Sequence, residues 1–148
     1  MQTALRPILL AEDNPADVEL TLSALRAIRI ANEIVVVGDG AEALDFLHRR
    51  GAFGGRITPQ PAVVLLDLKM PRVDGLEVLR QIRSTPELRH VPAVIFTSSR
   101  EERDIVRSYE LGTNAYMVKP VDFQEFITAI GGLGIFWALL NEPVPDSR

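Results

Sequence analysis

The chain has 148 residues, of which 47% are hydrophobic and 24% charged, as is typical of one soluble globular domain. Its formal net charge of −4 argues against nucleic acid as a partner, because phosphate binding needs a basic face. The absence of cysteine excludes disulfides and thiol chemistry. No apolar stretch reaches the ~18 residues of a membrane span. The first residues, MQTALRPILLAED, show no signal peptide, so the sequence predicts a cytoplasmic protein.

Five short apolar runs have the composition of β-strands. They lie at residues 7–11, 34–37, 62–66, 93–96 and 115–118. Their residues are apolar almost without interruption, which is typical of parallel strands that are covered on both faces.

A helix is predicted after each apolar run. Asn14 and Pro15 form an N-cap with proline at the first helical position, and Val18, Leu22 and Leu25 then recur at helical spacing. The other helices are predicted to begin at Asp39, near Leu76, at the Ser99–Glu102 capping box and at Asp122. This alternation predicts an α/β fold, in which a parallel sheet carries helices on both faces.

Polar side chains follow four of the five predicted strands, at the point where each strand ends. Each by itself has an ordinary explanation as a helix cap, a first-turn acid or a turn residue. Because the carboxyl ends of parallel strands meet at one edge of a sheet, the whole set is expected to lie together and form a site. The set consists of Glu12, Asp13, Asp67, Thr97 and Lys119, with Pro120 next to the lysine.

The chemistry of this set favours a phosphoryl group as its ligand. Carboxylates that share a site repel one another, and a hard divalent cation such as Mg²⁺ or Mn²⁺ relieves the repulsion. Lys119 adds a second positive charge and Thr97 a hydroxyl, so a dianionic phosphoryl group is well matched. Asp67 follows a strand expected at the centre of the sheet, and a carboxylate there is a candidate nucleophile that forms an acyl phosphate.

Four motifs resemble the receiver domain of two-component response regulators, in the order and at the spacing of that family. They are LLAEDNP, VVLLDLKMPRVDG, VIFTSS and AYMVKPVD, and the resemblance covers residues 6–130. It implies a flavodoxin-like (CheY-like) doubly wound five-stranded parallel sheet in the order 2-1-3-4-5, with five helices. It also implies a phosphoacceptor that takes phosphate from a partner kinase's phosphohistidine, requires Mg²⁺ and promotes its own autodephosphorylation. Such a protein is not an enzyme acting on other substrates.

By the same resemblance, Asp67 is the phosphoacceptor and Asp13 the direct metal ligand. Glu12 is the second acid, which in the family often acts through metal-bound water. The backbone carbonyl of Lys69 completes the metal site. The side chain of Lys69 is expected to face solvent, where it tunes the lifetime of the phosphate.

The resemblance also assigns a switch and a phosphate partner. Thr97 resembles the hydroxyl that moves to the phosphoryl group, and Tyr116 the aromatic that turns inward with it. An ordinary half-buried strand tyrosine is the alternative for Tyr116. Lys119 resembles the lysine that pairs with phosphate, and the Lys119–Pro120 bond resembles a peptide bond that is cis in the family.

A finer resemblance joins the chain to the single-domain regulators that pair with cyanobacterial and bacterial phytochrome kinases. It rests on the long loop RRGAFGGRITPQP, on SRE…IVRSYELGTNAYMVKPVD and on the aromatic tail IFWALLNEP. It implies a bacteriophytochrome histidine kinase as partner and a homodimer formed through helix 4, strand 5, helix 5 and the Phe136/Trp137 region, with packing of the last segment on its own domain as the alternative. The glycines of 131–134 depart from this pattern, because each costs roughly 1 kcal/mol relative to alanine inside a helix. Either the last helix ends early, or another backbone approaches it closely.

The domain organisation predicted from the sequence is a receiver domain at 1–140 and a Pro-rich polar tail at 141–148. No output domain is expected, so a change in a binding surface would carry the signal.

Three other functions compete with this interpretation. A phosphatase of the haloacid-dehalogenase type needs an acid two residues after its nucleophile, where this chain has Lys69. A flavin or nucleotide binder needs a glycine-rich loop after the first strand, where this chain has AEDNPAD. A scaffold without phosphorylation would not need the complete set of acids, threonine and lysine.

Overall fold

The computed structural model describes residues 6–27, 30–98, 115–119 and 122–132. The strands are β1 (Ile8–Ala11), β2 (Ile34–Val37), β3 (Val63–Asp67), β4 (Ala93–Thr97) and β5 (Ala115–Val118). The helices are α1 (Pro15–Ala27), α2 (Gly40–His48), α3 (Gly75–Ser84) and α5 (Phe123–Gly132), with a 3-10 turn η1 at Gly51–Phe53. The helix predicted from Ser99 lies outside the described residues.

All five strands are parallel and form one sheet in the order β2-β1-β3-β4-β5, which confirms the predicted topology. The register aligns the ends of the strands. Ala11 pairs with Val37 on one side and with Leu66 on the other, and Asp67 pairs with Phe96. The residues that follow β1, β3, β4 and β5 therefore meet at a single edge, as the sequence predicts for a sheet of this kind.

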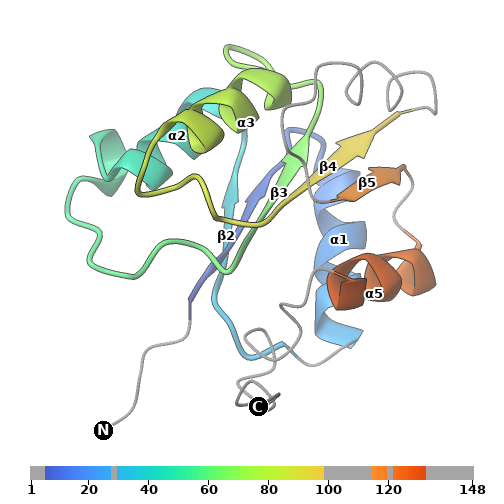
Figure 1. Ribbon diagram of the computed structural model, residues 1–148. Coiled ribbons are helices and arrows are strands. Elements are labelled where there is room, and N and C mark those ends of the chain that lie inside the picture. The colour runs from blue at the N-terminus through green and yellow to red at the C-terminus, as the bar shows by residue number, and fades with distance from the viewer. Residues whose placement is uncertain (1–5, 28–29, 99–114, 120–121, 133–148) are drawn as a thin grey trace, which may run out of the picture.

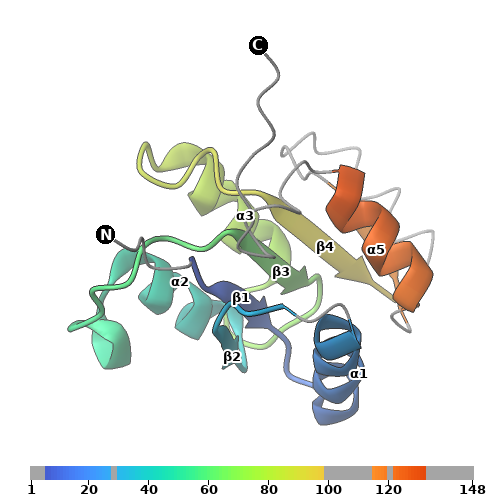
Figure 2. The ribbon, with the colours of Figure 1, turned by 90° about the horizontal axis from the view of Figure 1, so that it is seen from below.

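Helices cover both faces of the sheet, and the alternation of side chains along the strands explains why. Figures 1 and 2 show α2 and α3 on one face and α1 and α5 on the other. Leu9 and Leu66 belong to the core cluster under α2 and α3, whereas Leu10 and Leu65 belong to the cluster under α1 and α5. Both faces are buried, so the strands are apolar without interruption.

The predicted helix starts are confirmed by side-chain caps. Asn14 Oδ1 accepts from the Ala16 N–H at 2.9 Å, and Asp39 and Asp122 accept from the N–H groups of Glu42 and Glu125. These bonds satisfy amide donors that have no partner within the helix.

The buried face of α1 differs in one detail from the prediction. Thr21, Ala24 and Leu25 are its buried residues, whereas Leu22 is only half-buried. The Thr21 hydroxyl donates to the Asp17 carbonyl at 3.0 Å. This hydrogen bond within the helix lets a polar side chain occupy a buried position. Val18 and Leu25 pack on the core as predicted, and Thr21 takes the buried position that the hydrophobic pattern gave to Leu22.

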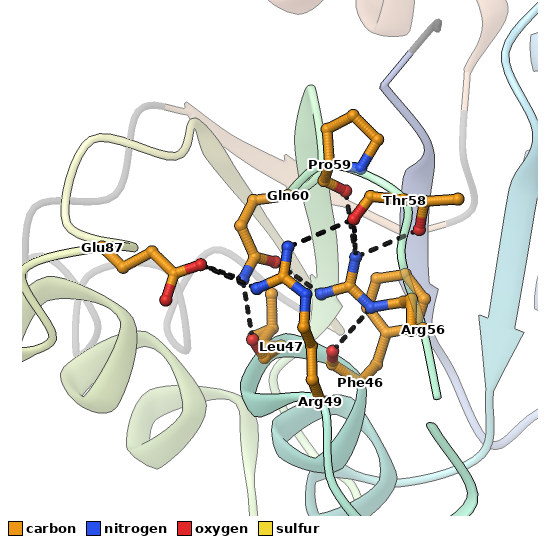
Figure 3. Close-up of polar contacts among 8 residues, drawn as sticks. All are labelled: Phe46, Leu47, Arg49, Arg56, Thr58, Pro59, Gln60 and Glu87. Atoms are coloured by element: carbon orange, nitrogen blue, oxygen red, sulfur yellow. Dashed lines mark hydrogen bonds and ion pairs between the residues drawn. The ribbon is translucent and has the colours of Figure 1, made fainter. Parts of the chain in front are cut away.

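The long loop after α2 is held by arginine side chains (Figure 3). The Arg56 guanidinium lies 4.0 Å from the Phe46 ring centre and donates to the Phe46 carbonyl at 3.0 Å and to Gln60 Oε1 at 2.7 Å. Arg49 pairs with Glu87 at 2.7 Å. The loop leads into the amino end of β3, so this network braces the edge of the sheet opposite to the residues that follow the strands.

The helix α5 includes Gly131 and Gly132 as its last described residues, so it does not end before the glycines. The rest of that segment, with Phe136 and Trp137, lies outside the described residues. Within the described ranges, no helix combines the length and the apolar composition required to cross a membrane.

Gly75 lies directly behind the end of β3. A Cβ at this position would lie 2.4 Å from the Asp67 carbonyl oxygen, and the Gly75 N–H donates to the Leu68 carbonyl at 2.9 Å. A side chain here would therefore push the start of α3 away from the end of the central strand.

We expect Gly75→Ala to lower the free energy of unfolding by about 1–3 kcal/mol, because the new methyl group overpacks against backbone. Gly55→Ala is the matched control, since nothing lies within 4 Å of a Cβ built there. The control should change stability by less than about 0.5 kcal/mol. Urea unfolding of both variants measures the difference, and equal stability of the two would contradict the close approach at Gly75.

Candidate functional site

The sheet brings together the acids and the lysine that follow different strands. Asp67 is the last residue of β3 and is 4% exposed. Glu12 follows β1 and is 2% exposed, whereas its neighbour Asp13 is exposed. Lys119 follows β5, and its N–H donates to the Thr97 carbonyl at 2.8 Å, which extends the ladder between β4 and β5. Residues more than a hundred positions apart in the chain thus form one cluster.

The ammonium group of Lys119 holds the cluster together. Its Nζ lies 2.9 Å from Glu12 Oε1, 2.9 Å from Asp17 Oδ2 and 3.1 Å from Asp67 Oδ1. The lysine side chain is only 16% exposed, so these ion pairs are less screened than pairs at the surface. A buried charge is tolerated when it is paired in this way.

Burial and charge shift the titration of two of these groups. Burial raises the pKa of Glu12 to about 7, because nearby Asp67 adds to the effect while Lys119 and the Asn14 N–H oppose it only in part. Burial also opposes the charge of Lys119, but the carboxylates of Glu12, Asp17 and Asp67 outweigh it and raise the pKa of the lysine. The lysine therefore stays charged at neutral pH.

The acids also fit a divalent cation. Glu12, Asp13 and Asp67 each offer a carboxylate oxygen, and these oxygens lie within 4.8 Å of one another. Glu12 Oε1 is buried and is paired with Lys119 Nζ at 2.9 Å. Closely spaced carboxylate oxygens of this type match the preference of Mg²⁺ and Mn²⁺.

Thr97 and Tyr116, the predicted switch residues, lie on the neighbouring strands β4 and β5, where Thr97 pairs with Val118 and Tyr116 with Ile95. Thr97 ends β4, is fully buried, and donates its hydroxyl to the Met117 carbonyl at 3.4 Å. Tyr116 on β5 is half-buried and packs against the core cluster under α2 and α3. Both positions are compatible with the predicted switch. The alternative for Tyr116, a half-buried tyrosine that packs on the core, is also compatible with its position.

Lys69 and Pro120 are the remaining residues of the predicted site. The Lys69 side chain is exposed, as the sequence predicts. Pro120 lies outside the described residues, so the cis bond predicted between Lys119 and Pro120 stays a prediction.

The sequence did not identify Asp17 as part of the site. Asp17 lies in the first turn of α1, where an acid is normally explained by the helix dipole. Its Oδ2 accepts a hydrogen bond from Lys119 Nζ at 2.9 Å. The two residues are 102 positions apart in the chain, and no local pattern links them.

The sequence also missed a brace for the loop after the acceptor strand. Arg72, between β3 and α3, donates from Nε to Asp39 Oδ2 at 2.9 Å and contacts the same oxygen through Nη2 at 2.8 Å. Burial opposes the charge of Asp39, but the Glu42 N–H and the Arg72 guanidinium hold the pKa of that carboxyl below its usual value. Arg72 has φ 67°, a left-handed conformation that needs compensating contacts. The Asp39 carboxylate supplies them.

Comparison with known proteins agrees with this geometry. The response regulator receiver domain family matches residues 8–131. Response regulator Rcp1 of Synechocystis sp. is 37% identical over 130 residues, which cover 88% of this chain and 87% of that protein.

Two solved structures are also similar. The bacteriophytochrome response regulator AtBRR is 61% identical with a TM-score of 0.87, and the match covers 95% of this chain and all 100% of that one. The Mn²⁺-bound form of Rcp1 is 35% identical with a TM-score of 0.73, over 95% of this chain and 99% of that one. The family match spans most of the chain and the fold agrees with it. This chain therefore belongs to the response regulator receiver domains of two-component phosphorelays, and its relatives include phytochrome-linked regulators.

Proposed function

We propose that Asp67 accepts a phosphoryl group from the phosphohistidine of a sensor histidine kinase and that the modified protein presents a changed binding surface. The observation that carries this proposal is the contact of Lys119 Nζ with Asp67 Oδ1 at 3.1 Å, inside a cluster of buried acids at the carboxyl edge of the sheet. A carboxylate beside a fixed cation is a nucleophile whose phosphorylated product is stabilised by the same cation.

The phosphoryl group passes from a histidine of the kinase to Asp67. The bond between phosphorus and the imidazole nitrogen of the kinase breaks while a bond between phosphorus and a carboxylate oxygen of Asp67 forms. The electron pair of the broken bond stays on the imidazole. Lys119 approaches one phosphoryl oxygen and Thr97 another, so the chain acts by positioning and by neutralising charge.

A divalent cation, Mg²⁺ or Mn²⁺, is proposed to be held by Glu12, Asp13, Asp67 and the backbone carbonyl of Lys69. When bound, this cation supplies positive charge that offsets the carboxylates and the incoming phosphoryl oxygens. The close spacing of the Glu12, Asp13 and Asp67 carboxylate oxygens supports this assignment, as does the Mn²⁺-bound form of the related Rcp1.

The switch is proposed to use Thr97 and Tyr116. The Thr97 hydroxyl now bonds the Met117 carbonyl at a long 3.4 Å, and this weak bond would be exchanged for one to the phosphoryl group. Tyr116 would then turn inward against the core cluster that it already contacts. A local change in charge would thereby alter the surface around β5 and α5.

The kinase partner proposed is a bacteriophytochrome, as supported by the name of the 61% identical regulator AtBRR. The homodimer predicted from the sequence stays a prediction, because helix 4 and the Phe136/Trp137 region lie outside the described residues. The cytoplasmic location, the domain bounds and the autodephosphorylation also stay predictions. The phosphatase alternative has no support at position 69, where the side chain is an exposed lysine.

We expect Asp67→Asn to abolish phosphoryl uptake from acetyl phosphate, because an amide oxygen is not a carboxylate nucleophile. Intact-protein mass spectrometry measures the uptake. Asp74→Asn is the matched control, since Asp74 is an exposed acid that caps α3 and asparagine caps equally well. Uptake by the Asp67 variant at the wild-type rate would overturn the assignment of the acceptor.

We expect affinity for Mg²⁺ to fall as the pH is lowered from about 8 to about 6, toward a limit of about tenfold per pH unit. The sign follows from the raised pKa of Glu12, about 7, because below this pH the carboxyl is protonated and the cation must displace the proton. Isothermal titration calorimetry at several pH values measures the effect.

Two variants test the origin of this pH dependence. Glu12→Gln should remove most of it, since glutamine does not titrate. Asp13→Asn should bind Mg²⁺ more weakly at every pH but keep the slope. A wild-type affinity that is flat over this range, or an unchanged slope in Glu12→Gln, would contradict the role given to Glu12.

A further inference from the structure

We propose that Asp17 is a positioning residue of the phosphoryl site. Its carboxylate holds the Lys119 ammonium in the unphosphorylated protein and competes for that ammonium with a phosphoryl group on Asp67. The inference rests on the proposed function, in which Asp67 is the phosphoacceptor, and adds a residue that sets how readily the phosphorylated state forms.

The contacts of Lys119 show the competition. An ammonium group has three N–H donors, and three carboxylates surround it. Glu12 and Asp17 each lie 2.9 Å from Nζ, and Asp67 lies 3.1 Å away. The contact with Asp17 is also a side-chain hydrogen bond. All three carboxylates therefore engage the ammonium group before any phosphoryl group arrives.

Asp17 has a different relation to the site from the other acids. Glu12, Asp13 and Asp67 place oxygens within 4.8 Å of one another, and Asp17 is not a member of that group. Its link to the site is Lys119, which it reaches from the helix α1. Divalent cation binding would engage the other acids and leave Asp17 as the partner of the lysine.

The backbone of Asp17 is fixed in place. Its N–H donates to Asn14 Oδ1 at 3.2 Å, and its carbonyl accepts from the Thr21 hydroxyl at 3.0 Å. The Asp17 side chain is 21% exposed, so its ion pair with Lys119 is partly shielded from water. The carboxylate is presented to Lys119 by a capped helix end, and this reduces the conformational entropy lost when the ion pair forms.

The ion pair between Asp17 and Lys119 affects the equilibrium between the unphosphorylated and phosphorylated states. An ion pair that exists mainly in the unphosphorylated state stabilises that state, and it weakens the binding of any group that must take Lys119 from Asp17. Removing the Asp17 charge replaces an ion pair with at most a neutral hydrogen bond, which competes less strongly with the phosphoryl group for the ammonium. The variant should therefore bind a phosphoryl mimic more tightly than the wild type does.

The experiment measures the affinity for beryllofluoride by ¹⁹F NMR titration, with Mg²⁺ saturating for each variant. Asp17→Asn should bind beryllofluoride about threefold to tenfold more tightly, the range expected when one partly buried ion pair no longer competes. Asp17→Glu restores a carboxylate and should return the affinity toward the wild-type value. This rescue separates the charge on Lys119 from a general effect on folding.

Glu19→Gln is the matched control, because Glu19 is an exposed acid on the same helix and lies two positions away, on a different face. It removes the same charge and should leave the affinity within about twofold of the wild type. A Glu19→Gln effect as large as that of Asp17→Asn would show that net charge, not the contact with Lys119, sets the affinity, and would overturn the inference.

Two further results distinguish a failure of the role of Asp17 from a failure of the proposed function. Beryllofluoride binding by Asp17→Asn that is equal to the wild type or weaker, with the fold intact by thermal unfolding, overturns the role of Asp17 but leaves Asp67 as acceptor. Failure of the wild type itself to bind beryllofluoride contradicts the proposed function and this inference with it.

Discussion

The organisation of this site depends on one buried ammonium group among several carboxylates. Lys119 contacts Glu12, Asp17 and Asp67 at about 3 Å, where the side chains are mostly removed from water. Without that cation the acids would repel one another and favour protonation. With it, the cluster keeps negative charge close to a carboxylate that is able to react. Burial, with a smaller contribution from Asp67, raises the pKa of Glu12 despite the nearby lysine, so a second cation beside this carboxyl would favour its charged form.

The parallel sheet is what makes this cluster possible. The carboxyl ends of β1, β3, β4 and β5 meet at one edge, and the strands below are buried on both faces. The close approach of Gly75 to the Asp67 carbonyl and the pairing of Arg72 with Asp39 fix the chain that leaves the central strand. A rigid backbone around the acceptor allows catalysis by positioning, because little reorganisation is needed when a phosphoryl group arrives.

Much of the fold and of the site could be predicted from the sequence. Uninterrupted apolar runs indicated strands buried on both faces, and caps such as Asn14 and Asp39 marked helix starts, because both depend on neighbours in the chain. The cluster of Glu12, Asp67 and Lys119 was predicted because parallel topology brings strand ends together. The buried face of α1 was less accurate, since Thr21 satisfies its hydroxyl within its own helix and takes a position that hydrophobicity assigns elsewhere.

The sequence by itself determined the order of the elements, the sheet topology and the set of reactive side chains at the strand ends. These follow from local periodicity and from the rules that govern connections between parallel strands. The tertiary structure decided which acids share the lysine. Asp17 joins the site because the first turn of α1 lies beside the end of β5, and that distance depends on how the helix packs on the sheet. Ion pairs act through space, so an acid that sequence assigns to the helix dipole becomes a partner of Lys119 only when the chain is folded.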